Sequence, residues 1–171
     1  MSRIKGAMKM QSKNSLSNGG FTLIEILAVV VILAIAALLA VPMLSSAGGT
    51  QLRAAADMIA ADIEYAKSMA ISRQKQYFVI FDTTSDSYKI ANESGLVTHP
   101  AKAGFQYIVN FKSDSRLNKV DIVEANFGSS NQVAFNYLGS PDSGGIVTLS
   151  TGTATLKVNV EPVTGFVSIT K

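Results

Sequence analysis

The sequence contains no cysteine and only one histidine, His99. Without cysteine, disulfides, thiol-ligated metal sites and thiol redox chemistry are excluded, and an exported form would need a core that holds without disulfides. A single histidine also excludes the usual zinc sites, and a Ser-His-Asp arrangement would have to use His99. Because His99 precedes Pro100 in a loop-like stretch, we expect a solvated or structural imidazole. The sequence offers no constellation typical of an enzyme, and neither a cofactor nor a metal is expected.

Acidic residues are missing from the first 20 residues, whereas four basic ones lie there: Arg3, Lys5, Lys9 and Lys13. Of the 15 basic side chains in the chain, 11 therefore lie beyond this segment, beside all 12 acidic ones. The sequence pI of 9.2 is largely a property of the N-terminal segment. A nucleic-acid or acidic-substrate partner does not follow from the pI alone.

Charged and strongly polar side chains are also absent from residues 26–44, and residues 26–41 are Leu, Ile, Val and Ala throughout. Residues 21–44 would form a helix of about 36 Å, enough to cross a bilayer core of about 30 Å. We therefore expect one membrane-spanning helix over 21–44. The positive charges before it are expected to stay in the cytoplasm, so the region after residue 44 should lie outside.

Glu25 lies near the start of this apolar segment. An ionised carboxylate in mid-bilayer costs about 3 kcal/mol, and less near an interface. One interpretation is an interfacial glutamate of a plain anchor, whose carboxylate reaches water. The other is that Glu25 has a cationic partner. A cut between Gly20 and Phe21 would create an α-amine four residues before Glu25, and the two charges could neutralise each other within one chain or between neighbours.

A basic leader, the residues Gly-Phe-Thr-Leu-Ile-Glu at 20–25 and about twenty apolar residues resemble the class III signal of type IV pilins and type II secretion pseudopilins. The resemblance implies that prepilin peptidase cuts after Gly20 and methylates the new amino terminus at Phe21. It also implies that Glu25 helps to dock each new subunit into a growing filament. Pro42 stands at position 22 of the mature chain, where this family commonly has proline.

The same resemblance implies the partners and the location. The expected partners are prepilin peptidase, other pilins or pseudopilins through the N-terminal helix, and an inner-membrane assembly platform. The expected location is the bacterial inner membrane, with one span, a cytoplasmic leader and a periplasmic C-terminal domain that joins a pseudopilus or pilus. A secretory signal peptide is an alternative, because Ser-Ser-Ala at 45–47 would suit a cut after Ala47. Against it, the apolar run exceeds the usual 7–15 residues and includes Glu25.

Pro42 predicts a helix kink, because proline lacks the backbone donor and clashes with the preceding turn. Gly48 and Gly49 add a second weak point, so a flexible joint is expected over 45–50. From 51 to 75, apolar residues recur every three to four positions, which predicts an amphipathic helix. Its apolar face would consist of Leu52, Ala55, Ala56, Ile59, Ile63, Ala66 and Ala70, and Met58 and Met69 are expected to belong to the core.

The remainder is typical of β structure. Strands are expected at 77–82, 88–91, 105–111, 120–125, 133–137, 146–150, 156–160 and 166–170, with a polar hairpin connection at 83–87. Asp82 and Asp86 beside this connection could indicate a calcium loop, but their spacing lacks the EF-hand pattern and a turn explains them better. Short strands joined by glycine-containing turns predict antiparallel sheets, which the helix covers. The predicted class is α+β: leader 1–20, transmembrane helix 21–44, joint and amphipathic helix 45–75, and antiparallel β domain 76–171.

The segment 133–139, a turn, two strands and the final Thr-Gly-Phe-Val at 164–167 are similar to the GspH/FimT group of minor pseudopilins and pilins. This resemblance implies a long helix against a β-sandwich of two sheets. It leaves two functions open: a minor subunit of a type II secretion pseudopilus, or a FimT-like minor pilin of a type IV pilus in biogenesis or DNA uptake. DNA-binding relatives have arginines around the final glycine turn, whereas here the one basic residue after Gly165 is Lys171. Nucleic acid is therefore not an expected partner.

Overall fold

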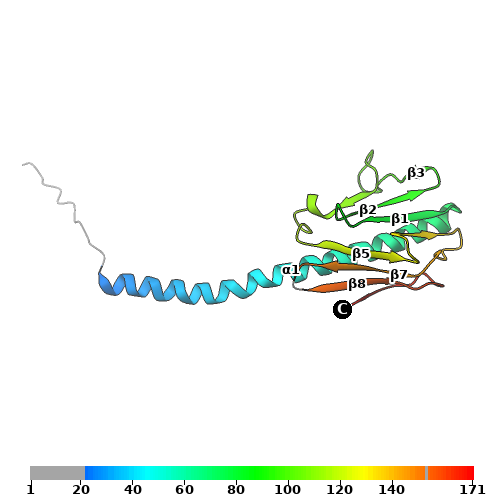
Figure 1. The fold of residues 1–171 in the computed structure, drawn as a ribbon. Coiled ribbons are helices and arrows are strands. Elements are labelled where there is room, and N and C mark those ends of the chain that lie inside the picture. Colours follow the sequence, from blue (N-terminus) through cyan, green and yellow to red (C-terminus); the bar gives the residue numbers. More distant parts are fainter. Residues whose placement is uncertain (1–21, 153) are drawn as a thin grey trace, which may run out of the picture. The chain divides into compact units, whose positions relative to one another are not determined.

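The structure, a computed structural model, describes residues 22–152 and 154–171, and the side chains of all of these except residues 38–47. The predicted leader and both sides of the predicted cleavage site, Gly20 and Phe21, lie outside the described residues. The chain divides into two compact units, with the boundary between Ala40 and Val41. Helix α1 (Leu23–Arg73) contributes residues to both units (Figure 1).

The first part of α1 begins directly after Thr22. The Thr22 carbonyl accepts hydrogen bonds from the backbone N–H of Glu25 at 3.0 Å and of Ile26 at 3.2 Å, and the Thr22 hydroxyl also accepts from Glu25 N–H, at 3.3 Å. Every side chain described in this part, residues 22–37, is exposed. The predicted span over 21–44 also includes Phe21 and side chains from residue 38 onward, which lie outside the description. Within the described part of the chain, no helix meets the combined length and apolarity needed to cross a membrane.

Residues 41–50 are helical, including Pro42 and the predicted joint at 45–50. The joint is thus not an interruption of the helix, and the kink at Pro42 stays a prediction. The helix ends at Arg73 because Gln74 adopts a left-handed conformation, with φ 53°. Lys75 N–H then donates to the Ala70 carbonyl at 3.3 Å, which satisfies one of the carbonyls left over at a helix end.

The apolar face predicted for residues 51–75 is confirmed. All seven residues of the predicted face are buried, none more than 2% exposed. Met58 and Met69 are partly buried and pack against the same core. Residues three and four positions apart share one side of a helix, so this spacing alone selects the buried face.

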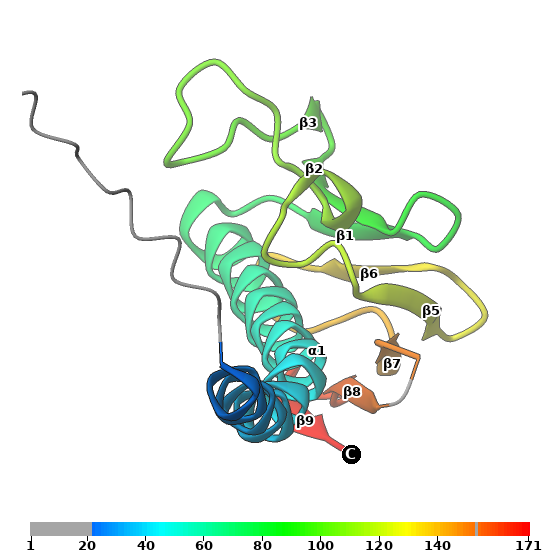
Figure 2. The same ribbon diagram turned by 90° about the vertical axis from the view of Figure 1, so that its left-hand side faces the viewer.

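Two antiparallel sheets form the rest of the second unit (Figures 1 and 2). The first has the order β3-β2-β1-β6, with β4 also paired to β2, and consists of β1 (Tyr77–Asp82), β2 (Ser87–Asn92), β3 (Gly95–Leu96), β4 (Ile108–Asn110) and β6 (Gln132–Phe135). The second has the order β5-β7-β8-β9, and consists of β5 (Asp121–Phe127), β7 (Gly145–Ser150), β8 (Thr155–Val160) and β9 (Val167–Thr170).

One hydrophobic core joins the second part of α1 to both sheets. Ile59 and Ile63 of the helix, Phe81 of β1 and Leu149 of β7 are all 0% exposed and belong to the same cluster. Figure 2 shows this part of α1 beside both sheets, with β5 next to β6 where the sheets meet. Burying a side chain of this size contributes about 1.5–3 kcal/mol, so packing against the helix helps to hold the two sheets together.

Most predicted strands are present, and the β1–β2 hairpin closes at Asp82 and Ser87 as expected. The strand predicted over 105–111 is wrong at both ends: of these residues only Ile108–Asn110, which form β4, pair with β2, and residues 111–113 form a short 3₁₀ helix. That helix starts because the Asn110 side chain accepts a hydrogen bond from Ser113 N–H at 3.1 Å. The strand predicted to reach Tyr137 ends at Phe135, and the two-residue β3 was not predicted.

Candidate functional site

The start of α1 is the site that the sequence singled out. Thr22 and Glu25 have the Thr-x-x-Glu spacing of a capping box, and the Thr22 hydroxyl accepts the Glu25 N–H. Glu25 therefore lies in the first turn, where the positive end of the helix dipole favours a carboxylate. Its side chain is exposed. Of the other predicted residues, Gly20, Phe21 and the side chain of Pro42 lie outside the description.

The first part of α1 presents a continuous apolar surface. Its ten large apolar side chains between Leu23 and Ile35 are 49–83% exposed. Exposed apolar area of this extent marks a membrane contact or a protein interface. The surface can be covered either by lipid or by helices of the same kind.

A cluster around Asp62 attaches α1 to the first sheet. Asp62 Oδ2 accepts a hydrogen bond from the Tyr88 hydroxyl at 2.5 Å, and Oδ1 accepts one from the Tyr107 hydroxyl at 2.7 Å. Burial raises the pKa of the Asp62 carboxyl, and the two tyrosine hydrogen bonds oppose that rise. Burial of Tyr88 itself, together with the Asp62 charge, raises the pKa of Tyr88 well above its usual value. No local pattern in the sequence predicts this cluster, because Asp62 is separated from its partners by 26 and 45 residues.

His99 extends the Asp62 cluster as a structural residue. Its ring stacks on Tyr107 with centroids 4.5 Å apart, and Tyr107 also stacks with Tyr65 of α1 at 5.6 Å. His99 Nδ1 accepts a hydrogen bond from Ala101 N–H at 3.1 Å. The imidazole thus holds the loop between β3 and β4 against the helix, in line with its expected structural role.

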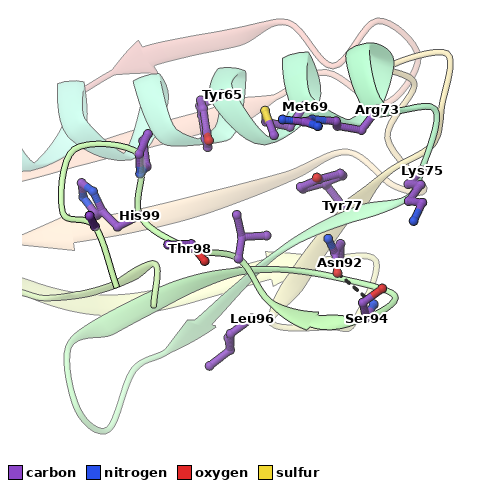
Figure 3. A pocket seen from close by; sticks show the side chains of 13 residues that line it. Tyr65, Met69, Arg73, Lys75, Tyr77, Asn92, Ser94, Leu96, Thr98 and His99 are labelled. Carbon is purple, nitrogen blue, oxygen red and sulfur yellow. Dashed lines mark hydrogen bonds between the residues drawn. The ribbon is translucent and has the colours of Figure 1, made fainter. Parts of the chain in front are cut away.

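An open groove of about 890 Å³ lies between the C-terminal turns of α1, the strands β1–β3 and the loop that follows β3 (Figure 3). Tyr65, Met69 and Arg73 line it from the helix, and Asn92 lines it from the end of β2. The volume falls in the range of about 300–1,000 Å³ that is usual for ligand sites. No pattern in the sequence predicts this groove, because its wall is assembled from segments far apart in the chain.

The two aspartates beside the β1–β2 turn act as turn and loop anchors. Asp82 accepts hydrogen bonds from Ser85 Oγ at 2.8 Å and from Thr84 N–H at 2.9 Å, and these bonds lower the pKa of its carboxyl. Asp86 instead accepts from Ile122 N–H at 2.7 Å and pairs with Lys112 at 3.4 Å. The turn interpretation is therefore confirmed. No group of three or more candidate ligands that could hold a metal occurs in the described part of the chain.

The glycines of the C-terminal resemblance have a structural reason. Gly139 has φ +84°, and a Cβ there would lie 2.7 Å from Cδ1 of Ile71 on α1. Gly165 has φ +59°, and its carbonyl accepts a hydrogen bond from Lys67 Nζ at 3.2 Å. Both turns need a left-handed conformation and lie against the helix. These positions thus fix how the last turns of α1 meet both sheets.

Comparisons with known proteins agree with this arrangement. A model of the family described as type II transport protein GspH matches residues 55–164, and a model of the prokaryotic N-terminal methylation motif matches residues 16–41. A search of curated proteins finds no match.

Two solved structures are similar to this chain. The minor pseudopilin EpsH from the type 2 secretion system of Vibrio cholerae is 8% identical with a TM-score of 0.53, over 70% of this chain and 96% of that one. The type IV minor pilin FimU of Pseudomonas aeruginosa is 14% identical with a TM-score of 0.50, over 70% and 88%. At these identities the similarity shows a shared fold.

Proposed function

The chain belongs to the family of type II transport protein GspH and is a minor pseudopilin, and we propose that it works as a filament subunit held by its N-terminal helix. In this proposal the precursor is anchored in the bacterial inner membrane over residues 21–44, with the leader in the cytoplasm and the β domain in the periplasm. Prepilin peptidase removes residues 1–20 and methylates Phe21. The subunit then leaves the membrane for a filament whose core consists of such helices.

One observation carries the proposal: the side chains of residues 22–37, most of them apolar, are all exposed on a helix that begins just after the predicted cleavage site. Lipid covers such a surface before assembly, and neighbouring helices can cover it afterwards. Ala36 and Ala40 have the four-residue spacing of small residues that lets helices approach closely. Because neighbouring helices replace lipid around the apolar side chains, the subunit can leave the membrane without exposing them to water.

Glu25 supplies the selectivity of docking in this proposal. After cleavage, the Phe21 amine and the Glu25 carboxylate are two charges near the edge of an apolar segment. Pairing the amine of one subunit with the carboxylate of its neighbour neutralises both charges, which lowers the cost of placing them in apolar surroundings. A subunit that still has its leader offers no such amine, so only processed subunits would dock.

The family consists of structural subunits, and we infer that this member is not an enzyme. The single histidine supports this inference, because its ring stacks on Tyr107 and its Nδ1 accepts a backbone hydrogen bond. The proposed partners are prepilin peptidase, the other pseudopilins and the inner-membrane assembly platform.

A minor pilin of a type IV pilus is the second candidate, favoured by the fold shared with FimU. Both candidates use the same processing and the same helix. A role in DNA uptake has less support, because the final turn has no arginine and its nearby Lys67 is hydrogen-bonded to Gly165.

The filament proposal is tested by incorporation into sheared filaments in the native host. The parent chain should be found in the filament fraction, whereas Gly20→Ala should remain unprocessed in the membrane. Ser17 lies in the same leader, so Ser17→Ala serves as a control that should be processed normally. Normal incorporation of uncleaved Gly20→Ala would contradict the proposal.

A further inference from the structure

The groove at the C-terminal end of α1 carries charge of one sign. Its charged lining residues are Arg73 and Lys75, and neither forms an ion pair within residues 22–152 and 154–171. Glu93 lies in the turn next to the groove but does not line it. The groove is therefore suited to a ligand that brings negative charge.

The two ends of the groove differ in chemistry (Figure 3). Lys75 and Asn92 lie toward one end, Tyr65 and His99 lie toward the other, and the Arg73 side chain extends from the first end toward Met69. Asn92 Oδ1 accepts a hydrogen bond from Ser94 N–H at 2.8 Å, which orients the amide and leaves its NH₂ group as the donor. A ligand that fits both ends has an acceptor or anion at one end and an apolar or aromatic group at the other.

The aromatic end is held by contacts within the chain. Tyr65 is stacked with Tyr107, whose hydroxyl is fixed by Asp62 and whose other neighbour is His99. A wall that does not need to be ordered on binding loses less conformational entropy when a ligand arrives. The groove thus combines a fixed apolar surface with two long, exposed cationic side chains.

We propose that this groove binds an acidic segment of a partner protein, with a carboxylate between Arg73 and Lys75 and an apolar side chain against Tyr65 and Met69. The inference rests on the proposed function, since a filament subunit meets other proteins through its β domain. An extended peptide suits the site because the groove is open and its lining comes from α1, β1, β2 and the loop after β3, with Lys75 and Asn92 apart from Tyr65 and His99. A carboxylate is the anion, because an arginine fork and an amide donor match its two oxygens.

Binding is tested with the full-length chain in detergent micelles. The probe is a rhodamine-labelled peptide of alternating glutamate and phenylalanine, followed by fluorescence anisotropy with the signal of empty micelles subtracted. A second peptide has glutamine in place of every glutamate. The groove variant is Arg73→Gln with Lys75→Gln, and the control is Lys89→Gln with Lys119→Gln, which removes the same charge from exposed residues outside the groove.

The acidic peptide should bind the parent and the control equally, and binding to the groove variant should fall by at least about tenfold, the cost of losing charge-assisted hydrogen bonds. A second variant, Ser94→Glu, places a negative charge at the cationic end and should weaken binding in the same direction. Circular dichroism of each variant checks that the fold is retained. A cation at a helix end also stabilises the helix. Loss of that role would lower the melting temperature of the protein but would not change its preference for the glutamate peptide over the glutamine peptide.

Equal losses in the groove variant and the control would overturn the proposal, because net charge alone would then explain binding. Equal binding of the glutamine peptide would overturn it as well. A short DNA duplex that binds more tightly than the peptide and is lost in the same groove variant would assign the groove to nucleic acid instead. None of these outcomes bears on processing or filament incorporation, so a failure here is distinct from a failure of the proposed function.

Discussion

Asp62 on α1 accepts a hydrogen bond from the hydroxyl of Tyr107, which lies 45 residues further along the chain, at 2.7 Å. The same carboxylate accepts the hydroxyl of Tyr88, a side chain that is 1% exposed. This relationship attaches the helix to the first sheet by polar contacts, in addition to the apolar face. The same helix includes residues 22–37, so the attachment connects the β domain to the segment that is proposed to enter a filament.

Replacing Asp62 by alanine should destabilise the protein. The change leaves the buried Tyr88 hydroxyl and the Tyr107 hydroxyl without their acceptor, at an expected cost of about 2–4 kcal/mol in the free energy of unfolding. Urea unfolding in detergent, followed by circular dichroism, measures it. Asp57→Ala is the matched control: Asp57 pairs with Arg53 on the exposed side of the same helix, and its loss should cost less than about 0.5 kcal/mol. Similar losses in both variants would contradict the role assigned to Asp62.

Asp62 should also contribute to the pH dependence of stability. Burial raises the pKa of Asp62 in the folded state above the ordinary value of 3.8, so the folded protein keeps this proton at a pH where the unfolded chain has lost it. The stabilising effect is fully present below pH 3.8 and is lost as the pH rises through the folded pKa. Relative to Asp62→Asn, which does not titrate, the parent should therefore lose stability as the pH rises from below 3.8 toward neutrality. Urea midpoints of both proteins across this range provide the measurement, and a difference that does not change with pH would refute the prediction.

Gly139→Ala should destabilise the contact between the last turns of α1 and the β6–β7 connection. The new Cβ requires a left-handed backbone and also meets Cδ1 of Ile71 at 2.7 Å, the end of a side chain that is 45% exposed and has to shift, with an expected total cost of about 1–3 kcal/mol. Gly95→Ala isolates the backbone part, because Gly95 also has a positive φ but no atom lies within 4 Å of the position that a Cβ would take there. Thermal unfolding of the two variants should therefore differ, with Gly139→Ala melting lower. Equal melting temperatures would show that the approach to Ile71 is unimportant.

Glu25 has two candidate roles, and Glu25→Gln separates them. A glutamine can replace glutamate in a capping box, but it cannot neutralise an amine. If charge pairing controls docking, Glu25→Gln should be processed normally yet enter filaments as poorly as Glu25→Ala does. Thr22→Ser keeps the capping hydroxyl and serves as the control with normal incorporation. Wild-type incorporation of Glu25→Gln beside a defective Glu25→Ala would leave only the capping role.

Local patterns account for what the sequence predicted well. The buried face of α1 between Leu52 and Ala70 follows from its helical spacing, and the β1–β2 hairpin follows from alternation around a polar turn. The same alternation misled at 105–111, where Phe105 is 68% exposed and belongs to a loop closed by its own hydrogen bonds to His99 and Lys102. Alternation indicates a strand only when both ends find a neighbouring strand, and that condition is not local.

The groove and the Asp62 cluster could not be predicted for a related reason. Asp62, Tyr88 and Tyr107 come from a helix, a strand and a loop, and no local pattern indicates that they meet. The N-terminal site is the reverse case: its motif is compact in sequence, so Gly20, Phe21 and Glu25 were assigned roles from a family resemblance carried by a few consecutive residues. Their roles in cleavage, methylation and assembly stay predictions.

The most direct test of the filament proposal is the intact mass and N-terminal peptide of the protein purified from its native membranes. The predicted result is a chain that begins at Phe21 with a methylated amine. A chain that begins at Gly48 would indicate an ordinary exported domain, and an intact start at Met1 would indicate a plain membrane anchor. Either of these two results would contradict the proposal that this chain is processed for assembly into a filament.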